Sequence, residues 1–438
     1  MKKLSVILLG LLLSIPGFAQ NDASKDNEFS IGAQLRSRAE YRDGYGAPHA
    51  DGVDPGAFIN DRARLSFDYK RDKLSLGFSA QQVGVWGQDP QIASSGRTMI
   101  NEAWANLNLG DGFFMKLGRQ SLIYDDERIL GGLDWNVAGR YHDALKFGYE
   151  NPMNKLNLVL AFNQNSEGNP GNPNGTYYIT TTPGPGYKTM QMLWYQHIGS
   201  KVFNISFLAM NLGLETGTAP AATDVKFLQT LGTNISYQPG SFQLYGTFYY
   251  QTGKATATAT PASKDVSAYM GALNLSYAFT PQWKLMAASD YMSGDDGKDP
   301  GKFTAFNPLF GTHHKFYGTM DYFYANPFAN GLNPGLWDNQ LGLSFKASPK
   351  VLLALNYHNF STTTDVVSGD VKQTRGLGSE WDFQLTWNIM KDVAFTGGYS
   401  TYFGNDALKA VKGGDPSKSQ NWLWASLNIN PKIFSTKW

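Results

Sequence analysis

The feature that most constrains the fold is a strict alternation of polar and apolar residues along extended stretches. Residues 34–42, QLRSRAEYR, place a glutamine, three arginines and a glutamate on one face of a strand and mostly apolar or small residues on the other. Residues 60–70, NDRARLSFDYK, repeat the pattern with two more arginines. Any fold for this chain must therefore keep one heavily charged face of several strands in contact with water.

The same period of two continues to the C-terminus, in LSLGFSA (74–80), KLNLVLAFN (155–163), VFNISFLA (202–209) and EWDFQLTWNI (380–389). Segments of this length match tilted membrane-crossing strands of about 9–11 residues better than soluble strands of about five or six. We expect the apolar positions of these strands to face lipid, namely Leu74, Leu76, Phe78, Leu156, Leu158, Phe203, Ile205, Phe383 and Leu385.

The composition supports a membrane β-barrel and excludes several other classes. Aromatic residues make up 14% of the chain and there are 47 glycines, a mixture expected when an apolar outside with aromatic girdles encloses a wet inside. A formal net charge of +1 gives no reason to expect a nucleic-acid partner. The absence of cysteine excludes disulfides and cysteine-based metal sites.

The N-terminus, MKKLSVILLGLLLSIPGFAQ, has the layout of a secretory signal. Two lysines precede an apolar run of about ten residues, which is too short to span a bilayer, and small residues precede a cut after Ala19. We predict a cleaved signal peptide over residues 1–19 and a single barrel domain over 20–438. Such a signal directs a barrel of this kind to the bacterial outer membrane.

The connections between the strand-like segments alternate in length. Long loops rich in Gly, Pro and Asp fall between short turns at 70–73, 110–112, 151–155, 199–201, 238–241, 280–282, 347–350 and 390–392. About nineteen strand-like segments result, whereas single-chain bacterial barrels have even numbers of strands. Residues 316–324 have long loops on both sides, so we assign them to one outer loop, about 294–336. The prediction is an all-β, transmembrane, antiparallel barrel of about eighteen strands.

This architecture gives the arginines a place in a water-filled lumen, since each would cost about 2–4 kcal/mol on the lipid face at the bilayer midplane. A soluble β-solenoid or sandwich would leave the apolar faces of so many strands without a covering layer. A plugged transporter would need about 22 strands and an N-terminal plug, for which the chain has no room before its first strand.

Residues 118–149, GRQSLIYDDERILGGLDWNVAGRYHDALKFGY, resemble a signature segment of the alginate-export family of outer-membrane barrels through GRQ, DER, DW, GR and DALK in that order. Residues 293–323 are similar to a long late loop of that family. The resemblance implies an 18-stranded barrel whose basic lumen passes a polyanionic polysaccharide. It marks Arg119, Asp126, Glu127, Arg128, Asp134, Trp135, Arg140, Asp143 and Lys146. Such a charged set either pins a loop inside the barrel or contacts substrate, and both roles remain open here.

The predicted function is a passive outer-membrane channel with a partly basic lumen for anionic solutes, such as uronate saccharides or organic acids. A general diffusion porin and a structural or adhesive barrel are the alternatives. The predicted pore-lining or solute-binding residues are Arg36, Arg38, Glu40, Arg62, Arg64, Asp68, Glu102, Lys116, Arg119, Asp126, Glu127, Arg128, Asp134, Arg140, Asp143 and Lys146. Glu40, Asp68 and Glu102 are expected to limit repulsion among the cations.

Two expectations qualify this picture. Ten of the eleven arginines precede residue 141, so we expect a basic wall to face a neutral wall of Asn, Gln, Ser, Thr and Tyr. For Arg119 the alternation points to the apolar face, and only the resemblance or a bulge at Gly118 would turn it inward.

We expect neither an enzyme nor a cofactor, because no nucleophile-elbow, zinc-protease or P-loop motif occurs. Asp295, Asp296 and Asp299 form a weak calcium candidate without EF-hand spacing. His313 and His314 are adjacent, so in a strand they would point to opposite faces and share a metal poorly. The expected partners are outer-membrane lipid, an anionic small molecule or saccharide, and possible periplasmic proteins.

Overall fold

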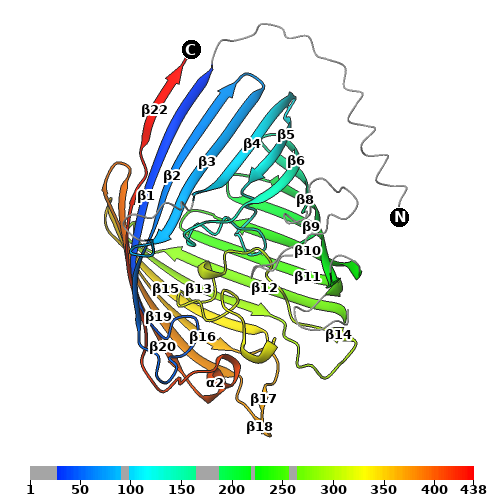
Figure 1. Ribbon diagram of the computed structural model, residues 1–438, viewed down its shortest axis with the longest axis vertical. Helices are drawn as coiled ribbons and strands as arrows, with labels where there is room; N and C mark the ends of the chain where they lie inside the picture. The colour runs from blue at the N-terminus through cyan, green and yellow to red at the C-terminus, as the bar shows by residue number, and fades with distance from the viewer. Residues whose placement is uncertain (1–26, 90–97, 164–186, 219–221, 256–263) are drawn as a thin grey trace.

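Apart from one small hairpin, the strands that the structure describes form one sheet that closes on itself (Figure 1). The computed structural model describes residues 27–89, 98–163, 187–218, 222–255 and 264–438. Strand β1 (Glu28–Asp43) pairs with β2 (Gly56–Arg71) on one side. On its other side it pairs with β21 (Gln420–Ile429) and β22 (Lys432–Lys437). The predicted signal peptide lies outside the described residues.

The sheet contains twenty assigned strands, of which two do not add to the wall as separate strands. β14 (Lys302–Phe303) has only two residues, and β21 and β22 are successive halves of one strand beside β1. The wall therefore has the predicted eighteen antiparallel strands. The others are β3 (Leu74–Val85), β4 (Thr98–Gly110), β5 (Phe113–Gln120), β6 (His142–Glu150), β7 (Asn154–Phe162), β8 (Thr189–Ile198), β9 (Phe203–Thr218), β10 (Ala222–Tyr237), β11 (Phe242–Ala255), β12 (Lys264–Ala278), β13 (Trp283–Met292), β15 (Leu336–Ser348), β16 (Val351–Ser361), β19 (Gly376–Met390) and β20 (Val393–Gly404).

The short and long connections alternate as predicted. All eight predicted turns coincide with connections between consecutive wall strands. They lie at the end of the barrel where β1 begins and β22 ends. Residues 316–324 lie in the connection between β13 and β15 and form no strand. The short-turn end is the periplasmic end in bacterial barrels, so the long connections face outward.

The outer and inner faces follow the alternation of the sequence. Leu76, Phe78, Leu156, Leu158 and Phe383 are exposed apolar residues. Their strand neighbours Ser79, Asn157 and Asp382 are buried on the inner side. The outside of the barrel is therefore apolar and the inside polar, as a lipid-embedded strand requires.

The inside is occupied by two long connections. The early loop, residues 121–141, joins β5 to β6, and the late loop, residues 293–335, joins β13 to β15. They pair through a parallel bridge between Leu130 and Phe310, with the Phe310 N–H donating to Ile129 O at 3.0 Å. An eighteen-stranded barrel is wide enough to need such filling. The buried apolar residues of the two loops include Leu122, Ile129, Leu130, Phe306, Leu309, Phe310, Tyr317, Met320, Tyr322 and Phe323.

Smaller elements lie in the outer connections. They are the hairpin β17 (Val367–Ser368) and β18 (Val371–Lys372), the helix α2 (Asp406–Lys412), and the 3₁₀ turns η1 (His313–Lys315) and η2 (Ala329–Gly331). Among the described residues, no helix is long and apolar enough to cross a membrane.

Candidate functional site: an arginine wall and the loop it holds

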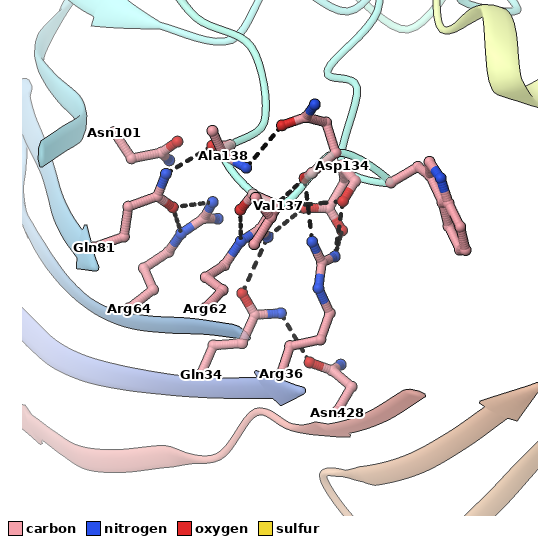
Figure 2. A network of polar contacts seen from close by, with 12 residues as sticks. Gln34, Arg36, Arg62, Arg64, Gln81, Asn101, Asp134, Val137, Ala138 and Asn428 are labelled. Atoms are coloured by element: carbon pink, nitrogen blue, oxygen red, sulfur yellow. Dashed lines mark hydrogen bonds and ion pairs between the residues drawn. The ribbon is translucent and has the colours of Figure 1, made fainter. Parts of the chain in front are cut away.

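Four arginines on the first two strands form the basic wall: Arg36 and Arg38 on β1, and Arg62 and Arg64 on β2. Their even spacing places them all on the inner face, and register neighbours such as Arg36 and Arg62 stand side by side. Figure 2 shows Arg36 and Arg62 directed at the early loop near Asp134 and Val137. Arg64 instead donates to Gln81, whose amide donates to Ala138 O of the loop at 2.7 Å. This shared inner face agrees with the alternation of the sequence, and the pore-lining role of the four arginines stays a prediction.

Two of these arginines share one carboxylate. Arg62 Nη1 lies 2.6 Å from Asp134 Oδ1, and Arg36 Nη1 lies 3.1 Å from Asp134 Oδ2. The Arg62 side chain is fully buried, whereas 71% of the Asp134 side chain is exposed. The carboxylate therefore occupies the meeting point of two guanidinium groups and still faces water.

Most other contacts of the wall go to main-chain carbonyls of the early loop. Arg62 donates from Nη2 to Asn136 O at 2.8 Å and from Nε to Val137 O at 2.6 Å. Arg38 donates to Trp135 O at 2.8 Å, and its guanidinium lies 3.8 Å above the Trp135 ring. Charge-assisted bonds of this kind are stronger than bonds between neutral groups. The arginines therefore pin the loop through Asp134 and Trp135, and loop pinning is one of the two roles left open for the signature segment.

The wall carries part of its own counter-charge. Glu40 accepts from Arg38 Nε at 2.8 Å and from Arg42 Nε at 2.9 Å, and its side chain is fully buried. Glu102 accepts the N–H of Ser121 at 3.0 Å, so it holds the start of the early loop. Asp68 is exposed, and within the described chain its side chain has no hydrogen bond or ion pair with which to offset the arginines.

Two lysines extend the basic surface along the next strands. Lys116 on β5 and Lys146 on β6 are register partners on the inner face. The Lys116 amine lies 3.7 Å from the centre of the Trp104 ring, and the Lys146 amine lies 5.7 Å from that of Phe114. Both remain half-buried, with access to the lumen water.

The DER segment of the early loop, residues 126–128, connects that loop to strand β13 and to the late loop. Arg128 makes a bidentate pair with Asp290 on β13, at 2.7 and 3.0 Å, and also contacts Asp126 at 2.7 Å. Burial alone would lower the pKa of Arg128, but the two carboxylates outweigh burial and raise it. Glu127 accepts from Lys315 of the late loop at 3.1 Å. These residues join the two loops rather than line an open path.

Arg140 also holds the late loop, by donating to Phe310 O and, at 3.0 Å, to Gly311 O. Among the described residues, no carboxylate faces it at hydrogen-bond distance, and burial lowers the pKa of Arg140 to about 10.

The structure corrects the prediction that Arg119 and Asp143 line the pore. They pair with each other at 2.9 and 3.0 Å on the outer face, alternating with Gln120 and His142, which are buried inside. Gly118 does have a positive φ of 119°, but the register of β5 with its neighbours is unbroken there. No residue is inserted, so the period of two keeps Arg119 on the outer face.

The predicted neutral late wall is also wrong. Four buried carboxylates line the inner face there, Asp290 on β13, Asp338 on β15 and Glu380 and Asp382 on β19, together with His358 on β16. His358 Nδ1 lies 2.9 Å from Asp338, and Glu380 accepts the N–H of Met320 at 2.8 Å. We call these five residues the acidic wall. The alternation already placed Glu380 and Asp382 inside, so the signal was present in the sequence.

The calcium candidate is not supported. Asp296 pairs with Lys298 at 2.6 Å, while Asp295 and Asp299 accept main-chain N–H groups of their own loop. In the described part of the chain, no group of three His, Asp or Glu residues is arranged to hold a metal ion. His313 and His314 contact different partners, the Tyr324 carbonyl at 3.1 Å and the Asp321 carboxylate at 2.9 Å.

A cavity of about 300 Å³ adjoins the basic wall. Its lining combines cations, amides and aromatic rings, namely Arg38, Arg42, Tyr45, Asn60, Trp135, Asn136, Val137, Asp321 and Asn326. Both faces of Trp135 are covered, by Arg38 on one side and by the His314 ring at 4.1 Å.

Comparison with known proteins agrees with the fold. Acinetobacter baumannii OccAB4 is similar in structure with a TM-score of 0.60 and 11% identity, covering 95% of this chain and 100% of that one. The outer-membrane protein OpdK of Pseudomonas aeruginosa has a TM-score of 0.61 and 10% identity, covering 94% and 99%. A structure of OpdK with vanillate gives 0.58 and 10%, covering 93% and 99%.

These similarities show a shared fold with barrels of the bacterial outer membrane. Among curated proteins, none matches the chain at a significant level of sequence similarity. The family model for alginate export, in contrast, matches residues 27–420, which is most of the chain. The chain therefore belongs to the alginate export family, as its signature segment predicted.

Proposed function

We propose that this protein is a passive outer-membrane channel for anionic solutes, such as acidic (uronate) saccharides or organic acids. The observation that carries the proposal is the unequal accessibility of the two charged walls. Arg36 and Arg64 of the basic wall and the two lysines keep contact with water, whereas Arg38, Arg62 and the carboxylates of the acidic wall are buried. A solute in the lumen water therefore meets positive charge first.

The exposed fractions make this contrast clear. The Arg36 side chain is 11% exposed, and Arg64, Lys116 and Lys146 are half-buried. Asp290, Asp338 and Glu380 are 0% exposed and Asp382 is 3% exposed. Two unit charges 4 Å apart interact by about 1 kcal/mol in water and by several at lower effective dielectric. The accessible cations thus favour an anion that passes, while the buried carboxylates are kept out of direct contact with it.

Asp134 indicates how a passing carboxylate would be held. Its carboxylate sits between Arg36 and Arg62 in the geometry that an acidic sugar or an organic acid would also use. The cavity beside Arg38 and Arg42 offers space next to this point.

The comparisons are in keeping with the solute class. OpdK has been crystallised with vanillate, which is a small carboxylate, and alginate is a polymer of uronates. The early and late loops fill much of the lumen, which favours solutes of limited width over a wide general pore.

Two measurements test the proposal. In a planar bilayer under a salt gradient, the reversal potential should show anion selectivity. In a liposome-swelling assay, glucuronate should enter faster than glucose, a neutral sugar of similar size. Cation selectivity would refute the proposal. Equal entry of the two sugars would instead favour a general diffusion porin, and the absence of any current would favour a structural barrel.

A further inference from the structure

The inner wall is hollowed at its periplasmic end by a cavity of about 520 Å³, whose lining includes none of the four wall arginines and no residue of the two loops. It is lined by Lys350, Asn388, Met390, Lys391, Asp392, Val393, Ala394, Asn428 and Asn430. This volume falls in the range of ligand pockets, about 300–1,000 Å³.

Irregular strand ends create the hollow. The register of β19 with β20 shifts between Asn388 and Met390, and β21 and β22 are interrupted at Pro431, whose carbonyl accepts from Ala33 at 3.0 Å. Proline has no N–H to continue the ladder. The two strands that flank β20 thus both leave their regular course near the periplasmic end.

The cavity faces the lumen. Asn388 is the register partner of Ala394, Ala394 of Asn428, and Asn428 of Arg36, so one inner row runs across β19, β20, β21 and β1. The alternating residues Trp387 and Leu427 are exposed on the outside, at 44% and 40%. The row ends at the arginine that holds Asp134.

A hydrogen bond links the cavity to that site. Asn428 Oδ1 accepts from Gln34 Nε2 at 2.9 Å, and Gln34 Oε1 in turn accepts from Arg62 Nη1 at 3.3 Å (Figure 2). The Asn428 NH₂ group stays available for a ligand.

The lining has polar groups that the fold leaves unused. In the described structure, the side chains of Asn388, Asn430 and Lys391 make no hydrogen bond or ion pair, and Lys350 Nζ makes one bond, to Ile389 O at 3.2 Å. The two amines outnumber the single carboxylate, Asp392. Amines suit a carboxylate, and amides that both donate and accept suit hydroxyl groups.

We propose that this cavity is a periplasmic subsite for one carboxylate-bearing sugar unit, from which an acidic saccharide passes along the row to Arg36. Lys350 and Lys391 hold the carboxylate, and Asn388, Asn428 and Asn430 bind hydroxyls. This inference rests on the proposed function, because it assumes that acidic saccharides traverse the lumen.

The test is block of the ion current by trigalacturonate, added to one chamber at a time. The chain has no cysteine, so Val367→Cys in the exposed β17–β18 hairpin can be biotinylated alone, and streptavidin added to one chamber then reports the orientation of each inserted channel. Lys350→Gln with Lys391→Gln should raise the half-blocking concentration from the periplasmic side about tenfold, the loss expected for a charge-assisted contact.

The matched control is Lys73→Gln with Lys201→Gln, which removes the same charge from two other periplasmic turns. We expect it to change block by less than about twofold, since exposed charges beyond the Debye length are screened. If the lysine pair of the cavity prevents insertion, Lys391→Gln alone gives a smaller change in the same direction.

The failure of the subsite and the failure of the proposed function are distinguishable. A wild-type channel that trigalacturonate blocks, with equal half-blocking concentrations in the cavity variant and the control, would overturn the subsite alone. A wild-type channel that is not anion-selective and is blocked from neither side would overturn the proposed function, and the subsite with it.

Discussion

The basic wall and the acidic wall hold inner loops in opposite ways. Arg36 and Arg62 reach inward to main-chain carbonyls of the early loop, and Arg36 keeps some contact with water. The carboxylates of β13, β15 and β19 are buried beneath both loops. Asp290 forms an ion pair with Arg128 there, and Glu380 accepts a hydrogen bond from the Met320 N–H.

The difference teaches that charge in a lumen has two separable roles. A guanidinium has five donors on a long arm, so it can fasten a loop and still present charge to solvent. Asp and Glu have short side chains, so they contact the loops only where the loops bury them. A buried charge contributes to the stability or specificity of the fold rather than to the electric field in the pore. Four predictions test this contrast, beginning with the largest effect.

Asp290→Ala should give the largest loss of stability, about 3–5 kcal/mol, because it leaves the buried Arg128 without its bidentate partner. Urea unfolding of the barrel in detergent micelles measures this loss. The matched control is Asp296→Ala, which removes an exposed pair with Lys298 and should cost at most about 1 kcal/mol. Equal losses in the two variants would show that the acidic wall is not a structural anchor.

Acid should loosen the late loop through His313. Burial, and then the nearby Arg140, lower the pKa of His313 to about 4, below its unfolded value of about 6.5. Stability from the neutral ring is complete above pH 6.5 and is lost as the pH falls toward 4, with a cost of about 1–2 kcal/mol near pH 5.

His313→Gln should remove this part of the pH dependence. Proteolysis of the late loop at pH 7 and at pH 5, compared between wild type and variant, provides the measurement. The prediction fails if both proteins change equally between the two pH values.

Arg36→Ala with Arg62→Ala should reduce anion selectivity. Each lost charge should lower the anion-to-cation permeability ratio roughly fivefold, because it removes about 1 kcal/mol of attraction for the anion. The pair Arg36→Lys with Arg62→Lys keeps the charge but loses the bidentate contacts that hold residues 134–137. We expect it to retain selectivity and to show larger current fluctuations. A loss of selectivity as large as that of the alanine pair would mean that the loop, and not the charge, controls the ion.

The smallest effect is expected for Glu380→Gln. The glutamine keeps an acceptor for the Met320 N–H, and Glu380 Oε2 is buried without a partner in the described structure. The free energy of unfolding should change by less than about 1 kcal/mol. A loss close to that of Asp290→Ala would show that the negative charge of Glu380 is itself needed.

The sequence was informative wherever the structure depends on neighbours along the chain. The period of two placed Leu76 and Phe78 outside and Arg36 and Arg62 inside, and the turn residues located all eight short connections. Because bacterial barrels have even numbers of strands, residues 316–324 were predicted to lie outside the wall, and they form no strand in the structure. For Arg119, in contrast, the inward orientation was predicted from the family resemblance against the alternation of polar and apolar residues. The register of β5 is uninterrupted there, so the alternation was the better guide.

The sequence by itself determined the barrel, the number of its strands, and which residues of the basic wall face inward, because a strand sets the side of each residue by alternation. Only the tertiary structure decided what those residues contact. Arg128 meets Asp290 across 162 positions of sequence, and Arg62 meets Asp134 across 72. Closure of the sheet brings distant strands to face each other, and the inward folding of two loops determines which charges are buried and which remain in water.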